Sequence, residues 1–586
     1  MDNNKIVEMF EDIADLLEVK GETVFVIRAY RNAARAIDKY PKQLSNMLLE
    51  GQDFRIIPGI GEAISDKALE LVSTGRLQYY DSLIAEFPSG ILEIMQISGI
   101  GPKTTKRLWN ELNVTSLSKL EESLDNGSFI SLSGMGKKTS DNIRLQLQFQ
   151  RDIGDSIPLH VARPLAGMMV DFLKANCSVA ENIMWVGGIR RFEESVKEIK
   201  LICTSSNPES VVTVFLSMPE IRDAISTDTH EVSAYMDQGI KVSLQIVDEA
   251  YIGSYLQYFT GSTQHNIQLR NHAASLGFTL NEQGLTRMDS GEYESVTNEY
   301  DLYTSLGLQY IPPELRQGSG EILASMGNSI PNLVRIADLK GDLHDHTNWS
   351  DGRDSMEDMV HAAFQKNFQY LAITDHSSGR GIANGLSVDR LAKHVKKIND
   401  LDKKYPSMMV LSGTEMDIRS DGSLDYSDDV IESIDWVIAS IHSAMGQDSK
   451  TMTERIQRAM NNPNVDVLGH LSTRLLGTRK PIEADFEFLF KAAADTGTAL
   501  EINASPERLD LKDSHIKLAR ELGVPLVISS DAHSTEGIEN LEFGVGIARR
   551  GWCEARHIVN SLPRNLFLQY LKTDKSERTR FFAGLV

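Results

Sequence analysis

The chain has few of the residues that would mark a secreted or membrane protein. Its 586 residues include three cysteines, Cys177, Cys203 and Cys553, whose wide separation excludes both a disulfide framework and a CxxC metal site. It lacks any apolar run of about 18 residues or more, so a membrane span is not expected. The acidic, amphipathic start MDNNKIVEMFEDIADLL is unlike a signal peptide. We therefore expect a cytoplasmic protein, without a membrane partner, that acts as a monomer.

Positive charge is also scarce. The formal net charge is −22, which argues against a protein that coats nucleic acid with a basic surface. An acidic protein can nevertheless hold DNA through backbone amides at helix N-termini. The charge therefore leaves DNA binding open.

Three segments in the first 150 residues share the five-residue pattern hydrophobic–x–Gly–hydrophobic–Gly. Each segment precedes a predicted helix. They are residues 57–61 (IPGIG), 97–101 (ISGIG) and 132–136 (LSGMG). Glycine permits positive φ and close backbone approach, and the following helix offers free N–H groups to a phosphate. A single copy could be a simple turn between packed helices, but three copies favour contact with DNA.

These segments resemble helix-hairpin-helix DNA-binding motifs. The resemblance implies backbone contacts at the glycines, with lysines of the following helices as phosphate partners. The predicted DNA-binding residues are Gly59, Gly61, Gly99, Gly101, Lys103, Lys106, Gly134, Gly136 and Lys137.

Lys67 lies in the helix that follows the first hairpin. In family X DNA polymerases, which this part of the chain resembles, the corresponding lysine forms a Schiff base with an abasic sugar. That chemistry requires a lysine with a lowered pKa, which a sequence does not reveal. An ordinary surface lysine or a phosphate contact is the alternative, and we favour it.

The resemblance to bacterial family X polymerases continues to residue 316. Residues 186–191 (VGGIRR) resemble the family's nucleotide-binding turn, residues 258–266 (YFTGSTQHN) resemble its thumb segment, and residues 311–316 (IPPELR) resemble the end of its polymerase core. The resemblance implies a palm and a thumb.

The polymerase signature itself is degenerate. Phosphoryl transfer by this family uses two Mg²⁺ ions held by three carboxylates. Glu198 and Lys200 stand where the family has its first two aspartates, Ser243 stands for the third, and Gly188 replaces the serine of the nucleotide-binding turn. A lysine ammonium repels the ions that this position should bind. We therefore predict that the palm has lost polymerase activity and serves as a scaffold.

Metal chemistry is expected in the C-terminal part, since ten of the fourteen histidines follow residue 340. Strand-like runs there end in histidine, aspartate or glutamate. An H-x-H pair at a strand end turns both imidazoles to one side, because side chains alternate along a strand. The candidate metal ligands are His344, His346, Asp351, His376, Glu415, His442, His470, Asp531 and His533.

These nine residues resemble the full ligand set of the PHP (polymerase and histidinol phosphatase) domain. The resemblance implies three divalent metals at the mouth of a distorted α/β barrel. The imidazole-rich set suits Zn²⁺ or Mn²⁺ better than Mg²⁺, which stays a third candidate.

We expect Glu415, His442 and Asp531 to be catalytic, with Glu415 bridging two metals. Whether His442 or His470 donates a proton instead of binding metal is left open. Asp375 and Asp417 could orient imidazoles, and Arg380, Arg474 and Arg508 could hold phosphates.

The predicted fold is a multidomain α/β chain. It comprises two helical hairpin domains (1–85 and 86–150), a nucleotidyltransferase-like α+β palm (151–250), a thumb (251–316), a linker (317–335) and a distorted α/β PHP barrel (336–586). In the first part helices are expected over 6–19, 24–37 and 91–97. In the palm β-like runs are expected at 183–189, 211–216 and 240–247.

The function predicted first is a DNA-repair phosphodiesterase, a 3′→5′ exonuclease that could also cleave abasic sites or remove 3′-phosphates. It would act on gapped, nicked or single-stranded DNA ends. One alternative is a working repair polymerase with an accessory exonuclease, against which Glu198, Lys200 and Ser243 argue. Another is a small-molecule phosphatase of the histidinol-phosphatase type, against which the three hairpins argue. A non-catalytic DNA-binding scaffold is the last, and the full ligand set argues against it.

Overall fold

The structure is a computed structural model. It describes residues 3–38, 40, 42–95, 97, 100–132, 135–137, 139–141, 143–144, 147, 156–236, 239–379 and 383–585. The chain divides into two compact units. The first comprises Met1–Gly154 with Gly477–Arg479, and the second comprises Asp155–Leu476 with Lys480–Val586.

The first unit is helical. Its described helices are α1 (Asn3–Lys20), α2 (Val24–Asp38), α3 (Leu44–Leu49), α4 (Glu62–Thr74), α5 (Gln78–Ile84), α6 (Ile91–Met95), α7 (Pro102–Leu112), α8 (Leu117–Asp125) and α9 (Ser128–Ser131). Apolar residues at helical spacing pack into two clusters, one around α1 and α2 and one around α7 and α8. The helices predicted over 6–19, 24–37 and 91–97 are confirmed, although the last ends at Met95.

The second unit begins with a palm-like sheet of five strands in the order β2-β4-β7-β6-β5. Strands β4 and β7 run parallel, and the other neighbours are antiparallel. A short pair of β1 (Ile157–Pro158) and β3 (Ser195–Val196) lies beside the sheet. The main elements are α11 (Leu159–Asn176), β2 (Ala180–Trp185), α12 (Gly187–Arg190), β4 (Ile199–Ser205), α13 (Pro208–Leu216), β5 (Ile221–Thr227), β6 (Glu231–Met236) and β7 (Lys241–Val247).

One predicted palm strand was wrong. Residues 211–216 (VVTVFL) lie in helix α13, although their β-branched content favours a strand. The helix start decides the outcome: the Asn207 side chain accepts from Ser210 N, and Pro208 occupies the first turn. The run predicted at 240–247 contains β7, whereas the run at 183–189 covers only the end of β2 and then enters helix α12.

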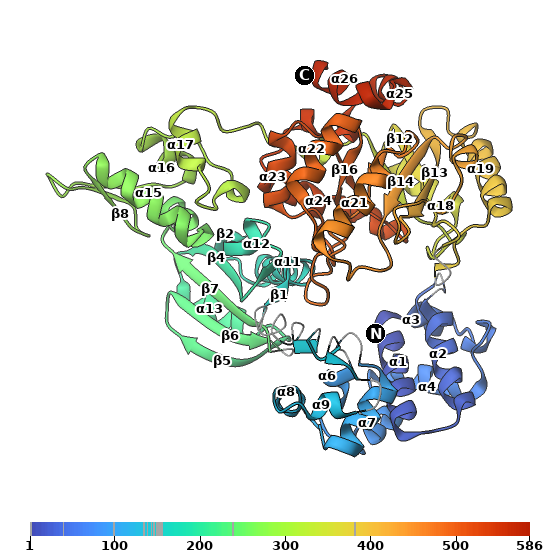
Figure 1. Cartoon of the computed structure of the whole chain (residues 1–586). Coiled ribbons are helices and arrows are strands. Elements are labelled where there is room, and N and C mark those ends of the chain that lie inside the picture. The colour runs from blue at the N-terminus through green and yellow to red at the C-terminus, as the bar shows by residue number, and fades with distance from the viewer. Residues whose placement is uncertain are drawn as a thin grey trace. The chain divides into compact units, whose positions relative to one another are not determined.

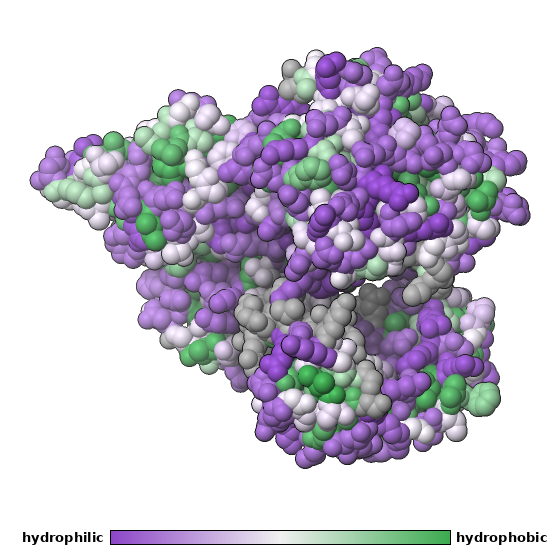
Figure 2. Space-filling model, in the orientation of Figure 1, coloured by the Kyte–Doolittle hydropathy of each residue, from purple (hydrophilic) through white to green (hydrophobic). Residues whose placement is uncertain are grey.

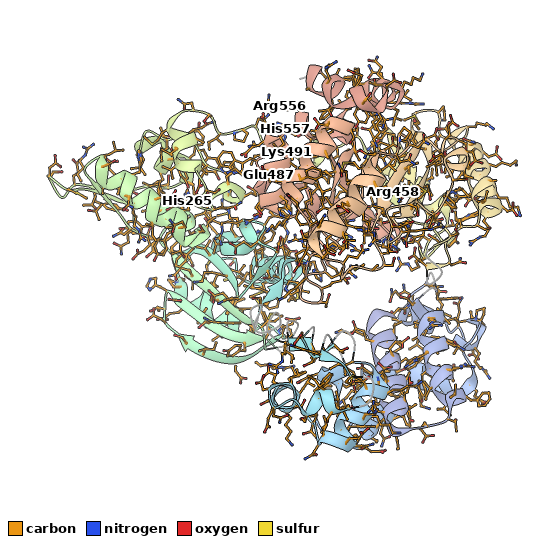
Figure 3. All side chains as sticks on the ribbon, viewed as in Figure 1. His265, Arg458, Glu487, Lys491, Arg556 and His557 are labelled. Atoms are coloured by element: carbon orange, nitrogen blue, oxygen red, sulfur yellow. The ribbon has the colours of Figure 1, made fainter. Side chains whose placement is uncertain are left out.

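The thumb-like segment follows as α14 (Ile252–Thr260), α15 (Thr263–Ser275), β8 (Phe278–Leu280), β9 (Leu285–Arg287), β10 (Tyr293–Glu294) and α16 (Glu299–Ser305). His265 of α15 (Figure 3) is buried and contacts Glu321 and Tyr303, each at 2.8 Å. Glu321 belongs to α17 (Glu321–Met326), which lies in the stretch expected to be a linker. This stretch is therefore folded against the thumb.

The rest of the second unit is a nearly closed barrel of seven parallel strands in sequential order, β11 to β17. The strands are β11 (Gly341–Asp345), β12 (Tyr370–Ile373), β13 (Met409–Asp417), β14 (Trp436–Ser440), β15 (Val467–Leu468), β16 (Ala499–Asn503) and β17 (Leu526–Ser529). A parallel bridge between Asp345 and Ala532 joins the first strand to the end of the last. The predicted α/β barrel is thus confirmed, and its first and last strands meet.

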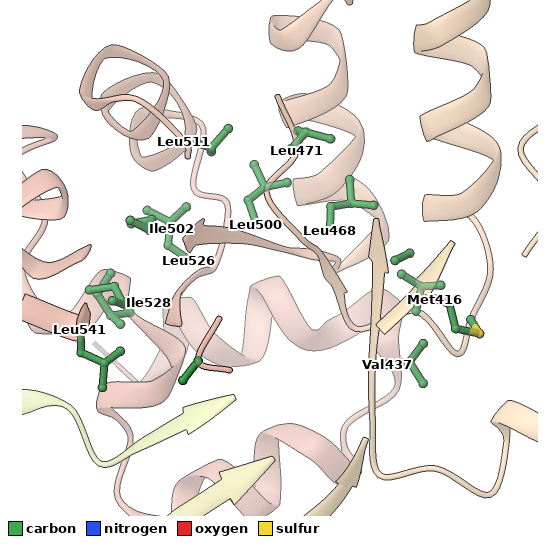
Figure 4. Close-up of a cluster of buried hydrophobic side chains, with 14 of the residues drawn as sticks. Met416, Val437, Leu468, Leu471, Leu500, Ile502, Leu511, Leu526, Ile528 and Leu541 are labelled. Atoms are coloured by element: carbon green, nitrogen blue, oxygen red, sulfur yellow. The ribbon is translucent and has the colours of Figure 1, made fainter. Parts of the chain in front are cut away.

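Helices surround these strands (Figure 1). They are α18 (Met356–Gln365), α19 (Val388–Asp402), α20 (Asp428–Ile431), α21 (Ser449–Met460), α22 (Phe486–Thr496), α23 (Asp513–Glu521) and α24 (Leu541–Arg550). Outward-facing apolar side chains of the strands, among them Val437, Leu468 and Ile502, pack in one buried cluster with those helices (Figure 4). Both faces of each strand are buried, as parallel sheets require.

Aromatic side chains close the N-terminal end of the barrel. Tyr370 and Trp436, which begin β12 and β14, contact Phe567 of α25 (Arg564–Lys572) at ring-centroid distances of 4.2 and 5.9 Å. Helix α26 (Arg578–Gly584) adds Phe582 to the same cluster. The opposite end, where the strands finish, is left for polar side chains.

Hydrophilic residues cover most of the face drawn in Figure 2, with small scattered apolar patches. Among the described helices, none combines the length and apolarity needed to cross a membrane.

Candidate metal centre and DNA-binding surface

The nine predicted ligands lie together at the C-terminal end of the barrel. His344 belongs to β11, Glu415 to β13, and the others follow strand ends. Seven have side chains no more than 7% exposed, whereas Asp351 and His533 have side chains 30% and 43% exposed. The cluster is therefore buried on one side and reaches solvent beside Asp351 and His533.

Four donor atoms surround one point. Nε2 of His344 lies 3.6 Å from Glu415 Oε2 and from Asp531 Oδ1, and Nε2 of His346 lies 3.6 and 3.3 Å from the same two atoms. A tetrahedral ion with bonds of about 2.0–2.2 Å needs donor atoms about 3.3–3.6 Å apart. The spacing suits a divalent metal.

Two further groups adjoin this one. His346, Asp351, His376 and His533 offer atoms within 4.8 Å of one another, and so do His376, Glu415 and His442. Within the described residues, Nε2 of His344 and both ring nitrogens of His346 are buried without a hydrogen-bond partner. Buried polar atoms are normally paired, so these nitrogens fit metal ligation.

Two carboxylates fix the tautomers of ligand candidates. Asp417 Oδ1 lies 2.5 Å from Nδ1 of His442, as predicted for an orienting residue. Glu501 of β16 lies 2.6 Å from Nδ1 of His344, and its other oxygen accepts from His470 N. We did not predict Glu501 as a site residue. A glutamate inside the apolar strand ALEIN was the signal that could have revealed it.

Asp375 has a different role from the one predicted. It accepts from Thr347 N, Ser350 N and Ser350 Oγ, and it contacts His394 Nε2 at 2.8 Å. It therefore holds the loop that carries Asp351, and its imidazole partner is His394, which is outside the predicted ligand set.

The predicted phosphate-binding arginines separate into two kinds. Arg474 is buried, and its Nε and Nη2 donate to Arg508 O, Leu509 O and the Glu194 carboxylate. Arg508 turns toward the cluster, with Nε 3.6 Å from Asp531 Oδ2. Arg474 is thus structural in this arrangement, whereas Arg508 faces the site. Arg380 lies outside the described residues.

Charges of the cluster shift its pKa values in opposite directions. Burial lowers the pKa of His376, but the Glu415 and Asp351 carboxylates outweigh it and raise the value to about 10. Burial and the Arg508 guanidinium lower the pKa of His470 to about 4. Burial opposes ionisation of Glu415, yet the neighbouring imidazoles hold its pKa well below the usual range. Without metal, carboxylates such as Glu415 therefore pair with protonated imidazoles such as that of His376.

A metal must displace those protons, because a ligating imidazole is neutral. His376 has a raised pKa, so it is protonated at neutral pH and loses its proton when metal binds. We expect Mn²⁺ affinity to rise with pH between about 6 and 8, with net proton release. Titration calorimetry in buffers of different ionisation enthalpy measures that release. A binding enthalpy independent of the buffer would contradict this expectation.

The glycine hairpins of the first unit share one backbone geometry. Ile60 N donates to Ile57 O, Ile100 N to Ile97 O, and Met135 N to Leu132 O, at 2.9–3.1 Å. Gly61, Gly101 and Gly136 then accept the first helical hydrogen bonds, from Ser65, Thr105 and Ser140. Three copies of one turn agree with the three copies of the sequence pattern. Gly99 and Gly134 lie outside the described residues.

The hairpin glycines differ in why another residue would be unfavourable at their positions. Gly59 has φ +99°, which other residues rarely adopt. A Cβ added to Gly61, Gly101 or Gly136 would meet no atom within 4 Å. These three positions leave the backbone open at the surface. Lys103 and Lys137 are exposed beside them, and Lys106 Nζ lies 3.5 Å from Lys20 O.

Lys67 lies on α4 among aromatic residues. Its Nζ is 5.0 Å from the centroid of the Tyr79 ring, which stacks on Tyr30, and 3.3 Å from Ala63 O. These contacts favour the reading of Lys67 as an ordinary cation over that of a nucleophile.

The palm positions predicted to be degenerate are neighbours in space. Lys200 of β4 and Ser243 of β7 are direct partners in the parallel pair. Lys200 Nζ lies 3.5 Å from Glu198 and 4.7 Å from the centroid of the Phe259 ring, and Lys241 lies 3.1 Å from Glu198. Gly188 lines a cavity of about 540 Å³ next to them. An ammonium group thus occupies the place expected for metal-binding carboxylates.

Family models match four parts of the chain. Residues 1–77 match a helix-hairpin-helix domain, 91–148 a SAM-like helix-hairpin-helix tandem, 255–317 the DNA polymerase beta thumb, and 342–505 the PHP domain. The chain is thus a polymerase-like protein fused to a PHP domain.

Relatives extend this match to the whole chain. The DNA polymerase/3′-5′ exonuclease PolX of Bacillus subtilis is 35% identical over 96% of this chain and 98% of its own length. A probable phosphatase of Thermoanaerobacter sp. is 27% identical over 40% of this chain and 95% of its own length. A probable phosphatase of a Shewanella species is 31% identical over 33% of this chain and 75% of its own length. The chain belongs to the bacterial family X DNA polymerases that carry a PHP domain.

Proposed function

We propose that this protein is a metal-dependent DNA phosphodiesterase that shortens DNA from the 3′ end in repair, and that the PHP centre performs the hydrolysis. The observation that carries the proposal is the cluster of nine ligand candidates, with unpartnered buried nitrogens on His344 and His346. The relative in Bacillus subtilis is named as a polymerase and a 3′-5′ exonuclease, which supports the polarity.

The centre is proposed to hold three divalent metals, with Zn²⁺ or Mn²⁺ preferred because six of nine donors are imidazoles. Three groups of donor atoms support that number. The residues that would hold the metals are His344, His346, Asp351, His376, Glu415, His442, His470, Asp531 and His533. When bound, divalent metals supply an activated water and neutralise charge on the phosphate oxygens.

Two carboxylates orient imidazoles of this site. The Glu501 carboxylate keeps one proton of His344 on Nδ1, so that Nε2, which faces Glu415 and Asp531, is the nitrogen left to bind a metal. Asp417 does the same for His442, whose Nε2 lies 3.3 Å from Glu415 Oε1. Arg508, beside Asp531, is placed to hold a substrate phosphate.

DNA is the proposed substrate because of the hairpins. Packing within the chain does not require glycine at positions 61, 101 and 136, because an added Cβ would contact no other atom. Glycine is needed at these positions if a DNA phosphate approaches the backbone amides at the start of α4 and α7, because a side chain there would obstruct it. This distinguishes a DNA enzyme from a small-molecule phosphatase.

Changing all three of these glycines to alanine should therefore weaken DNA binding and spare folding. We expect the affinity for a gapped duplex to fall about tenfold, because each methyl obstructs a backbone–phosphate contact. Fluorescence anisotropy measures the affinity, and the thermal midpoint checks the fold. The control is Gly167→Ala in α11, where a Cβ likewise meets no atom. Equal affinity of the triple variant and the control would contradict a hairpin contact.

The hydrolysis itself is tested with a single-stranded oligonucleotide in Mn²⁺. A 5′-labelled strand should give a ladder of shortened products, and a 3′-labelled strand should release a labelled mononucleotide first. A 3′-labelled strand that keeps its label on shortened fragments would reverse the polarity. No cleavage with Mn²⁺, Zn²⁺ or Mg²⁺ would reject the proposed activity.

A further inference from the structure

A glutamate of the palm contacts an arginine in a loop beside the PHP centre. Glu194 Oε1 lies 2.6 Å from Nη2 of Arg474, a residue 8% exposed that follows the ligand candidate His470. Glu194 sits in a firmly held turn: its carbonyl accepts from Leu159 N at 3.0 Å, and the next two residues form β3, paired with β1. The ion pair thus joins two ordered segments.

Arg474 also forms hydrogen bonds with the next loop of the barrel. Its Nε donates to Arg508 O at 3.0 Å, and its Nη2 donates to Leu509 O. Leu509 has φ +44°, a conformation that a bulky residue keeps only when its surroundings hold it. The guanidinium is bonded to both carbonyls, so it is one of the groups that hold this loop.

The loop touches the metal centre at two places. Arg508 Nε lies 3.6 Å from Asp531 Oδ2. Asp510 N donates to Asn503 O, and Asn503 Nδ2 donates to Asp531 Oδ2 at 3.0 Å and to Glu501 Oε2 at 3.1 Å. A displacement of Arg474 therefore reaches both Asp531 and the carboxylate that orients His344.

The palm also packs against helix α24 of the barrel close to this turn. Phe192 covers Gly546 of α24, where an added Cβ would overlap the aromatic ring. Arg550 of α24 donates to Arg191 O at 2.8 Å, and Arg163 of α11 pairs with Glu542 of α24. These contacts fix where the Glu194 carboxylate lies relative to Arg474.

We propose that Glu194 is a positioning residue of the PHP centre: by holding Arg474, it keeps the 508–510 loop, Asp531 and Glu501 in their working geometry. The palm then contributes to hydrolysis by direct contact, separately from any grip on DNA. This inference rests on the proposed phosphodiesterase function.

The test uses the full-length Glu194→Ala variant with Glu209→Ala as the control, since Glu209 is an exposed glutamate of the palm on α13. Bis(p-nitrophenyl) phosphate in Mn²⁺ is the substrate, because it is too small to need the hairpins. We expect kcat to fall about tenfold with KM within about twofold, since residues that orient metal ligands contribute 10–100-fold. Glu194→Gln, which keeps an acceptor oxygen, should recover part of the loss.

Two further readouts separate positioning from general damage. The Mn²⁺ affinity of Glu194→Ala, titrated by electron paramagnetic resonance, should fall several-fold while its thermal midpoint matches that of the control. In a double-mutant cycle, adding Glu194→Ala to Arg474→Ala should cost little more than Arg474→Ala alone, because both act through one contact. Additive losses would overturn the inference.

Failure of this inference and failure of the proposed function differ in outcome. If the wild type hydrolyses the ester and Glu194→Ala matches Glu209→Ala, the positioning role is overturned and the hydrolytic function stands. If the wild type hydrolyses neither the ester nor DNA, both are overturned.

Discussion

Replacing Glu415 by glutamine should lower hydrolysis of DNA by about a thousandfold or more. The Glu415 carboxylate is 1% exposed and lies at the centre of the cluster. Its oxygens lie 2.9–3.6 Å from ring nitrogens of five histidines, namely His344, His346, His376, His442 and His470. Glutamine keeps the shape and removes the charge, so two donor groups would lose their shared carboxylate at once.

The measurement combines initial rates on a labelled oligonucleotide with the Mn²⁺ content of the purified protein after dialysis. Glu415→Gln should lose both activity and metal, whereas Glu432→Gln, at an exposed glutamate of the same barrel, should lose neither. A Glu415→Gln variant that keeps a tenth of the wild-type rate would show that this carboxylate does not hold the reacting metals.

Placing aspartates at positions 200 and 243 of the palm should create an additional metal site. Lys200 and Ser243 are register partners on β4 and β7, and Glu198 lies within 3.5 Å of Lys200. We infer that the Lys200 ammonium keeps divalent ions out, so that the palm does not extend primers. Changing Lys200 and Ser243 to aspartate replaces one positive charge by two negative ones beside Glu198.

The double variant Lys200→Asp/Ser243→Asp should bind at least one more Mn²⁺ per chain than the wild type. Lys197→Asp is the matched control, because it adds a carboxylate at an exposed position of the same segment. Equal Mn²⁺ stoichiometry in the double variant and the wild type would contradict the view that these two side chains exclude the ions. Primer extension by the wild type would contradict the inferred loss of activity outright.

The nine ligand candidates were predictable from the sequence because strands end on one side in a parallel α/β barrel. Residues at successive strand ends, such as His376, Glu415 and His442, then lie close together whatever the loop lengths between them. Glu501 was not predicted because it lies inside a strand. The alternation of side chains along a strand does not reveal which buried carboxylate contacts a histidine of the metal site.

Local and tertiary signals explain the remaining differences. Residues 211–216 are β-branched, yet Asn207 and Pro208 start a helix, and the capping signal outweighs propensity. The 317–335 stretch reads as a linker from composition, but Glu321 is buried against His265. The contact of Glu194 with Arg474 joins residues 280 positions apart, which no local pattern could predict.

The most direct test of a hydrolytic PHP centre beside a silent palm is one primer assay. A 5′-labelled primer on a gapped template is incubated with Mn²⁺ and all four dNTPs, for the wild type and for His344→Ala. We predict shortening by the wild type and an unchanged primer with His344→Ala. Lengthening by either protein, or shortening that persists in His344→Ala, would contradict the account.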